Sequence, residues 1–272
     1  MKIWHPDNET FKPLKDMDNH FKNGFYSLVS RKEEKDLTYF LECFEDYTKK
    51  NSPDILKKKR CDDLPYSSNA KVWKERRKDI DIISSYINDR ENLDILDVGC
   101  WNGWLSNHFS KRRHNLIATN IFIDEINGIQ AKKYFSSDFI SLQMISDDIF
   151  RIKHSFDIIV FNRNWAYVSD KQKTIENAKS LLKNNGIIIF TGLSIYHNTL
   201  KMNEIMAKKN ERFLNTYNIP LLYKPSKGYL DTDDLNELKE NSVVIKPYSH
   251  LRNLVSVIFQ KDFKSCYGIL RR

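Results

Sequence analysis

The chain has 272 residues, 40% of them hydrophobic and 29% charged, with a formal net charge of +8 at pH 7. This length suits one large α/β domain with an appendage, and the composition is that of a globular chain and excludes a disordered one. No run of about 18 apolar residues exists, so no membrane span is expected. The N-terminus lacks the apolar core of a signal peptide, which makes cytoplasmic residence the expectation.

The positive charge permits an acidic partner such as RNA, a nucleotide sugar or a lipid headgroup. Basic clusters occur at residues 57–60, 76–78 and 111–113, and none is interleaved with aromatic residues as in a surface that stacks single strands. Compositional bias alone explains these clusters equally well. The four cysteines include no C-x-x-C pair, so neither a disulfide framework nor a zinc site is indicated.

Residues 1–65 are expected to form an irregular and helical N-terminal extension. A capping-box pattern begins at Ser30, and apolar residues follow at helical spacing as far as Asn51-Ser-Pro, which ends the helix. A second helix is predicted over residues 69–88.

From Leu93 onward, strands alternate with helices, which favours a parallel sheet with crossover helices over residues 66–272. We expect an α/β fold with a doubly wound, seven-stranded, mostly parallel sheet that has helices on both faces. The predicted helices cover residues 104–112, 127–134 and 170–183. The predicted strands cover residues 94–98, 116–119, 142–145, 157–161, 187–191, 243–246 and 255–260.

Residues 193–230 interrupt this alternation, with a helix predicted around 199–215. The segment falls between the fifth and sixth strands, at the carboxyl edge of the sheet, where ligands bind in open α/β folds. We expect a lid or an acceptor-binding insert, and a structural excursion without function stays open as the alternative.

The most informative segment is Leu93-Asp-Ile-Leu-Asp-Val-Gly-Cys-Trp-Asn-Gly-Trp104, where an apolar strand runs into two glycines and a helix follows. Such a loop places bare backbone N–H groups beside a ligand, and a Cβ at either glycine is expected to push that ligand away. One glycine of the dinucleotide-binding fingerprint is missing, and the Gly-Lys-Ser/Thr of a phosphate-binding loop is absent.

The segment resembles motif I of the class I S-adenosylmethionine-dependent methyltransferases, a hydrophobic–Asp–hydrophobic–Gly–x–x–x–Gly pattern. The resemblance implies that S-adenosylmethionine is the cofactor. It places Asp97, Gly99, Trp101 and Gly103 around the methionine half, with the Asp97 carboxylate accepting from the cofactor ammonium. A turn-capping role is the alternative for Asp97.

The same resemblance assigns the ribose and adenine contacts. The ribose position, which usually holds an acid, falls on Asn120, with Asp124 as the alternative. An amide offers only its oxygen, without charge, as an acceptor. Asp147 is expected to receive the adenine amine, with Asp148 lining the same slot, unless the pair caps a turn instead.

Three further residues complete the predicted cofactor set. Asn164 lies in Asn162-Arg-Asn-Trp165, which lacks the prolines of the Asn/Asp-Pro-Pro-Tyr motif and so disfavours methylation of adenine or glutamine nitrogens. Tyr66 and Arg76 precede the sheet, where similar enzymes close a helix over the cofactor. Arg76 suits a carboxylate, although a solvated helix charge is the more common role.

For a hydroxyl acceptor, a base must lie near the carboxyl ends of the fourth and fifth strands. His197 is the first choice, because an imidazole takes a proton near neutral pH, and Tyr167 and His154 are the reserves. No metal is required. The leading prediction is O-methylation of a small or saccharide-like acceptor. An RNA methyltransferase and a degenerate cofactor-binding regulatory module stay open, with a nicotinamide enzyme a distant fourth.

Overall fold

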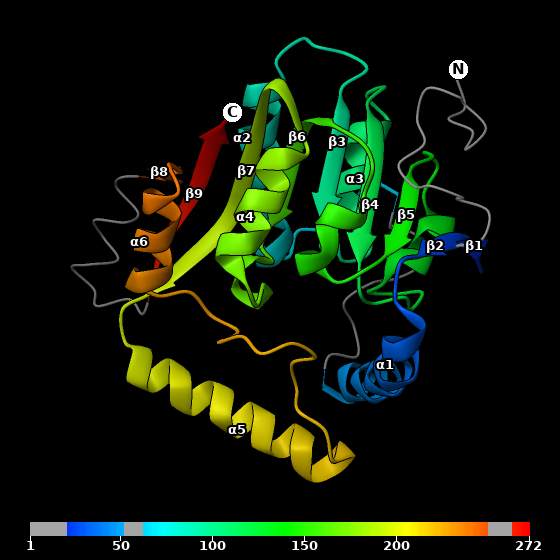
Figure 1. Ribbon diagram of the computed structural model, residues 1–272, viewed down its shortest axis with the longest axis vertical. Coiled ribbons are helices and arrows are strands. Elements are labelled where there is room, and N and C mark those ends of the chain that lie inside the picture. The colour runs from blue at the N-terminus through cyan, green and yellow to red at the C-terminus, as the bar shows by residue number, and fades with distance from the viewer. Residues whose placement is uncertain (1–20, 52–61, 250–262) are drawn as a thin grey trace.

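The computed structural model describes residues 21–51, 62–249 and 263–272. Within these ranges the strands form a nine-stranded sheet in the order β1-β2-β5-β4-β3-β6-β7-β9-β8 (Figure 1). The strands are β1 Phe21–Lys22, β2 Phe25–Ser27, β3 Asp94–Val98, β4 Asn115–Asn120, β5 Ile140–Gln143, β6 Phe156–Asn162, β7 Leu182–Tyr196, β8 Val244–Pro247 and β9 Phe263–Arg271.

The mostly parallel α/β sheet predicted from the sequence is confirmed. Strands β3 to β7 run parallel, and β9 joins antiparallel to both β7 and β8. The strand order reverses at β3, which has β4 on one side and β6 on the other. In open α/β sheets such a reversal point is where ligands bind, at the carboxyl ends of the strands.

Two strands come from the N-terminal extension, which was expected to be helical and irregular. Strands β1 and β2 form a small hairpin, and β2 pairs in parallel with β5 through Tyr26 and Leu142. Besides β9 at Phe263–Arg271, these two are the described strands that match none of the seven predicted ones. Short strands such as these leave too little periodicity to read from sequence.

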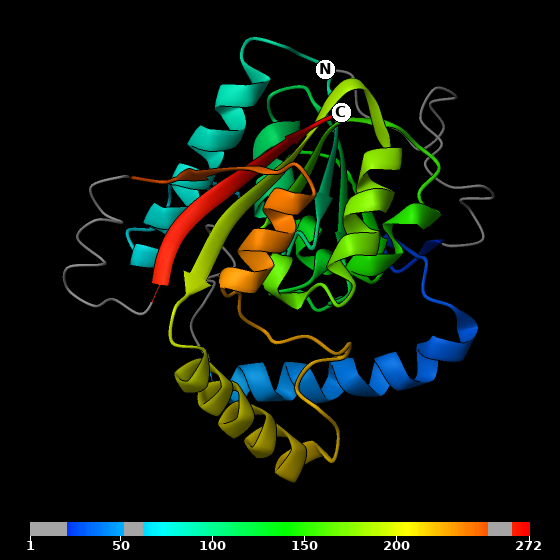
Figure 2. The ribbon, with the colours of Figure 1, turned by 60° about the vertical axis from the view of Figure 1, so that its left-hand side comes forward.

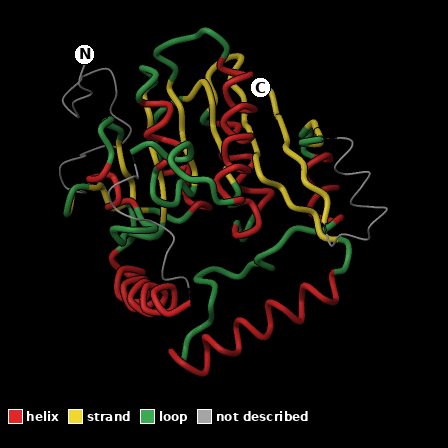
Figure 3. The backbone as a smooth tube through the Cα atoms, turned by 180° about the vertical axis from the view of Figure 1, so that it is seen from behind, coloured by secondary structure: helices red, strands yellow, loops and turns green. Residues whose placement is uncertain are grey.

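Helices cover both faces of the sheet, as expected for a doubly wound fold (Figures 1 and 3). Side chains of α2 and α3 bury one face, and side chains of α4 and α6 bury the other. The helices are α1 Arg31–Asn51, α2 Lys71–Ile87, α3 Trp104–Ser110, α4 Lys171–Ser180, α5 Thr199–Tyr217 and α6 Thr232–Glu240. Three short 3₁₀ helices are η3 Ile129–Tyr134, η4 Ser146–Arg151 and η5 Trp165–Tyr167. None of the helices in the described ranges combines the length and apolar character needed to cross a membrane.

Some element boundaries differ from the predicted ones. Strand β5 ends at Gln143, two residues before the predicted end, and η3 replaces the predicted α-helix over 127–134. Helix α4 is capped by Asp170, whose side chain accepts from Lys173 N, and it ends at Ser180 because β7 begins at Leu182. The predicted strand at 255–260 falls outside the described residues, and β9 supplies the antiparallel strand.

Helices α1 and α5 lie side by side beyond one end of the sheet, the end at which β7 leads into α5 (Figure 2). Between them lies a hydrophobic cluster separate from the two sheet cores, with Cys43, Phe213 and Leu221 at its centre. The Tyr217 hydroxyl donates to Asp46 Oδ2 at 2.6 Å, and Lys224 pairs with Glu33 at 3.2 Å. We call α1 and residues 197–230 the cap. The N-terminal extension and the insert thus form one structure over the carboxyl edge.

Candidate functional site

The loop between β3 and α3 adopts a backbone that requires its glycines. Gly99 and Gly103 have φ of +66° and +85°, in the left-handed region. A Cβ on Gly99 would lie 2.1 Å from Asn164 Nδ2, and one on Gly103 would lie 2.9 Å from the Phe139 ring. Neighbouring side chains therefore already require both glycines, and the expectation that they also make room for a ligand stays a prediction. The glycines admit the side chains of Asn164 and Phe139, which hold the loop in place.

Both tryptophans of the loop pack toward α2. Trp101, itself at φ +56°, stacks on Trp73 with ring centroids 5.9 Å apart, and Trp104 meets the same ring edge-on at 5.8 Å. Arg76 lies over Trp73 and Trp101, at 4.7 and 4.9 Å from the ring centroids. Burial and the nearby Arg163 lower the pKa of Arg76 to about 10. The guanidinium is thus fixed by stacking on the loop.

Asp97 carries the main unsatisfied polar group of the loop. Its Oδ2 accepts from Ser106 Oγ at 2.8 Å, whereas its buried Oδ1 has no protein partner. Burial raises the pKa of Asp97 to about 7. Nearby in the loop, Asn102 is fully buried, and its Nδ2 also lacks a partner. Buried polar groups are normally hydrogen-bonded, so this acceptor and this donor each retain a hydrogen bond that a ligand or a water would fill.

Asn120 ends β4 with its side chain turned to the same loop. Its Nδ2 donates to the Trp101 carbonyl oxygen at 2.7 Å. A carboxylate has no proton to donate there, which gives a physical reason for an amide at the position where the family usually has an acid. The Asn120 Oδ1 stays available as an acceptor for a ribose hydroxyl. Asp124, the alternative, instead accepts from two backbone N–H groups of its own turn.

Asn164 also belongs to the loop region. Its Nδ2 donates to the Val98 carbonyl oxygen and lies against Gly99, while its buried Oδ1 has no protein partner. Asn164 is therefore held against the loop, and its predicted contact with the cofactor stays a prediction.

Asp147 does not reach this region, and its predicted contact with adenine is corrected. Its Oδ1 accepts from Ser169 N, Ser169 Oγ and Asp170 N at 2.8 to 3.1 Å, so it caps the turn before α4. The reason is the early end of β5, which places Asp147 in η4 instead of directly after the strand. Met144 and Ile145 follow the strand instead, and Met144 N donates to the Asn120 carbonyl.

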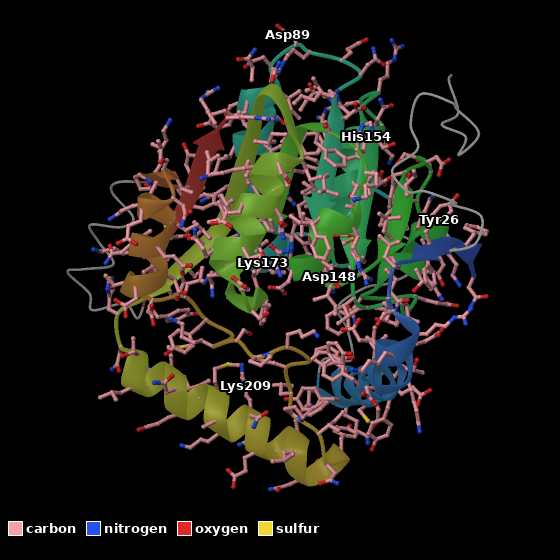
Figure 4. The ribbon with its side chains drawn as sticks, in the orientation of Figure 1. Tyr26, Asp89, Asp148, His154, Lys173 and Lys209 are labelled. Carbon is pink, nitrogen blue, oxygen red and sulfur yellow. The ribbon has the colours of Figure 1, made fainter. Side chains whose placement is uncertain are left out.

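Asp148 lies at the end of the sheet that faces the cap (Figure 4). Burial raises its pKa, Arg151 works against this, and Glu33 of α1 adds to it. Asp148 is therefore a half-buried carboxyl between the sheet and the cap, and it stays a candidate for the adenine side of the site.

Three other predicted residues lie away from the loop. Tyr66 is 52% exposed and contacts His108 and Arg77. His197 is exposed at the start of α5 and does not line the neighbouring pocket described below. His154, a reserve for the base, contacts Asp94 at 3.1 Å at the amino end of β3, far from the cap (Figure 4). The structure thus gives no support to His197 or His154 as the base.

Sequence reasoning missed a buried polar network beside the loop. Asp79 of α2 is fully buried and accepts from Arg163 Nε at 2.6 Å, Arg163 Nη2 at 3.3 Å and Asn162 Nδ2 at 3.1 Å. The Tyr248 hydroxyl also donates to Asp79 and accepts from Gly192 N. The sequence signal that could have revealed this network is Asp79, an acidic residue that lies within the apolar stripe of the helix between Trp73 and Ile83.

A pocket of about 200 Å³ opens next to this network, at the carboxyl ends of β6 and β7. Its side walls come from β7 and the segment after β6, and residues 228–230 of the cap close it. The polar side chains that line it are Arg163, Tyr167, Thr191, Ser194, Tyr196 and Tyr229. Asn164, between lining residues 163 and 165, rests on the loop, so pocket and loop are neighbours.

Comparison with known proteins places this geometry in a family. A family model described as a methyltransferase domain matches residues 89–224, half of the chain. The ubiquinone biosynthesis O-methyltransferase of Rickettsia canadensis is 26% identical over 166 residues, which cover 59% of this chain and 70% of that protein.

Two solved structures share the fold at low identity. The magnesium protoporphyrin IX methyltransferase ChlM from Synechocystis PCC 6803, with bound SAH, superposes with a TM-score of 0.50 at 12% identity, covering 88% of this chain and 99% of that one. The plantazolicin methyltransferase BpumL gives a TM-score of 0.51 at 12% identity, covering 90% and 100%. The chain therefore belongs to the methyltransferase domain family and is a class I S-adenosylmethionine-dependent methyltransferase.

Proposed function

We propose that this chain transfers the methyl group of S-adenosylmethionine to an oxygen atom of a small organic acceptor. The observation that carries the proposal is the orphan Asp97 Oδ1 near the carboxyl end of β3, in the sheet whose strands β6 and β7 carry the pocket at their carboxyl ends. Two relatives, from Rickettsia canadensis and Rickettsia felis, are named as O-methyltransferases, which supports an oxygen acceptor.

The residues of the loop fit the amino-acid end of this cofactor. Asp97 would accept from the ammonium, while Asn102 Nδ2 and the Arg76 guanidinium are donors suited to the carboxylate. Asn120 Oδ1 would accept from the ribose. When bound, the cofactor supplies an electrophilic methyl group, and the protein contributes alignment and exclusion of water.

The acceptor is expected to be small because the pocket is small and closed on one side by residues 228–230. A substrate that tracks along the surface, such as RNA, would require a basic groove with exposed aromatic residues. In one basic cluster, Arg77 instead donates within the protein to the Pro65 carbonyl oxygen, and Arg76 is stacked on Trp101 of the β3–α3 loop. Cytoplasmic residence stays a prediction.

The test is incubation of the protein with methyl-labelled cofactor and, separately, with a low-molecular-weight cell extract and with total RNA. Label should enter small molecules and not RNA. Asp97→Asn should abolish most incorporation, whereas the same change at exposed Asp89, at the opposite end of the sheet (Figure 4), should leave it intact. Label in RNA, or equal loss in both variants, would contradict the proposal.

A further inference from the structure

The pocket beside β6 and β7 holds no group able to take a proton from an acceptor at neutral pH. Among the residues that the structure describes, its lining contains no aspartate, glutamate, histidine, lysine or cysteine. The titratable groups there are Arg163 and three tyrosines, and the other lining residues are hydroxylic, apolar or glycine. Transfer to an ordinary alcohol requires a base, because the hydroxyl proton must leave when the new C–O bond forms.

The one charged side chain in this lining is a cation held in a fixed position. Asp79 holds Arg163 by Nε at 2.6 Å and by Nη2 at 3.3 Å, and Glu75 lies 3.8 Å from Nη1, beyond hydrogen-bond range. A guanidinium has five N–H donors in a planar fork, so three are left after the two that Asp79 takes. Gly192 allows this placement, since a Cβ there would lie 2.2 Å from Arg163 Cγ.

The tyrosines of the pocket lining supply hydrogen-bond donors and do not supply a base. Desolvation raises the pKa of Tyr167, and the nearby Tyr196 adds to this effect. Desolvation also raises the pKa of Tyr229, whose hydroxyl donates to Asn203 Oδ1 at 2.7 Å. These phenols stay protonated at neutral pH. A lining of one fixed cation and protonated hydroxyls suits an anion.

We propose that the acceptor atom is an oxygen already ionised in solution, a carboxylate or an acidic phenol, with Arg163 as its counter-ion. This inference rests on the proposed function and names its substrate class. The acceptor oxygen donates an electron pair to the methyl carbon as the carbon–sulfur bond breaks, and that bond pair stays on sulfur. The anion and the sulfonium become a neutral methyl ester or ether and a neutral thioether, so no proton needs to be removed at the site.

The linkage formed in the labelled extract tests this proposal. A methyl ester releases its label as volatile methanol in mild alkali, whereas an aryl methyl ether keeps the label there and yields a methoxyarene on analysis. The ester, or an ether of a phenol that is ionised at neutral pH, supports the inference, and the two products identify the source of the acceptor oxygen. An ether of a phenol that is protonated at neutral pH contradicts it. A methyl ether of an aliphatic alcohol, or an N-methyl product, would overturn the inference and leave the methyltransferase assignment standing. Absence of any labelled product would defeat the proposed function itself.

The pH profile of the purified reaction gives an independent readout. At saturating cofactor, a carboxylate acceptor should give a rate that is flat from about pH 6 to about pH 9, because the pocket lining in the described residues contains no carboxyl, imidazole, amine or thiol group. A phenol should give a rate that follows the phenol's own pKa. A step at an unrelated pKa that persists across different acceptors would reveal a protein base and contradict the inference.

Arg163→Lys tests the counter-ion, because it keeps a cation for Asp79 and removes the fork. The KM for the acceptor should rise about ten- to a hundredfold, while the affinity for S-adenosylhomocysteine stays unchanged. Arg113→Lys, at an arginine that is 78% exposed, is the matched control. An unchanged KM in a folded Arg163→Lys protein would exclude Arg163 as the counter-ion.

Discussion

At the scale of single residues, Asp97 combines a structural cost with a binding role. Its folded pKa of about 7 lies well above the ordinary value of 3.8, because the carboxyl is buried with one oxygen unpaired. Between about pH 4 and pH 7, the folded protein retains a proton that the unfolded chain has lost. Stability should therefore fall as pH rises through this window, by about 4 kcal/mol in total.

Asp97→Asn should remove this pH dependence in the ligand-free protein. An amide cannot ionise, so the variant should gain stability over the original chain as pH rises from about 4 to about 7, and the gain should level off above pH 7. Urea unfolding of both proteins at a series of pH values measures the difference. A constant difference across the range would show that Asp97 ionises normally.

Asn120 offers a second test. Restoring the acid that the family usually has at this position should lower stability and cofactor affinity and not improve them. Asn120→Asp replaces the donor to the Trp101 carbonyl with an oxygen, leaving two acceptors facing each other. We expect a loss of about 1–3 kcal/mol in stability, and weaker cofactor binding because the loop is released. Asn215→Asp, at an exposed position of α5, is a control for the substitution itself. An Asn120→Asp protein of unchanged stability that binds the cofactor more tightly would overturn this account.

The sequence identified the loop residues because motif spacing fixes them close to β3. It placed Asp147 wrongly because two residues of strand length decide whether an acid follows the strand or enters η4. The partners of Asp79 come from Asn162 at the end of β6, from Arg163 just after it and from Tyr248 after β8. Contacts between such distant segments leave no local pattern to read.

At the scale of elements, the sequence predicted the two parts of the cap, the N-terminal helix and the insert, but as separate features. The capping box at Ser30 and the helix from Thr199 were both visible, and α1 and α5 formed nearly as predicted. Their association was not predictable. An apolar stripe indicates that one face of a helix is buried, but it does not indicate which other element covers that face. Here each helix covers the other through Phe44, Tyr47 and Phe213.

Phe213 is the residue on which cap packing depends most. It is fully buried, and its ring contacts Phe40, Phe44 and Tyr47 of α1. Phe213→Ala should destabilise the cap by about 3–5 kcal/mol. Hydrogen exchange should then accelerate in α1 and α5 and not in β3 or β6. Leu214→Ala, at a neighbouring residue that is 42% exposed, is the control. Equal acceleration in the sheet would mean that the cap and sheet unfold as one unit.

At the scale of the whole molecule, the net charge of +8 first raised the question of an RNA substrate. A small acceptor in a pocket predicts weak salt dependence. Turnover should change less than about threefold between about 50 and 200 mM salt, whereas a protein neutralising about six phosphates loses about a thousandfold in affinity. Initial rates across this salt range decide between the two. A steep loss of rate with rising salt would favour an RNA substrate.

We expect the amino-acid end of the cofactor to lie against Asp97, near the carboxyl end of β3. Calorimetric titration with S-adenosylhomocysteine at pH 7.5, about half a unit above the pKa of Asp97, tests it most directly. The account predicts saturable binding that weakens at least about tenfold in Asp97→Asn, since a charge-assisted hydrogen bond is lost, and that is unchanged in Asp89→Asn. Binding of equal strength in all three folded proteins, or no binding to the original chain, would contradict it.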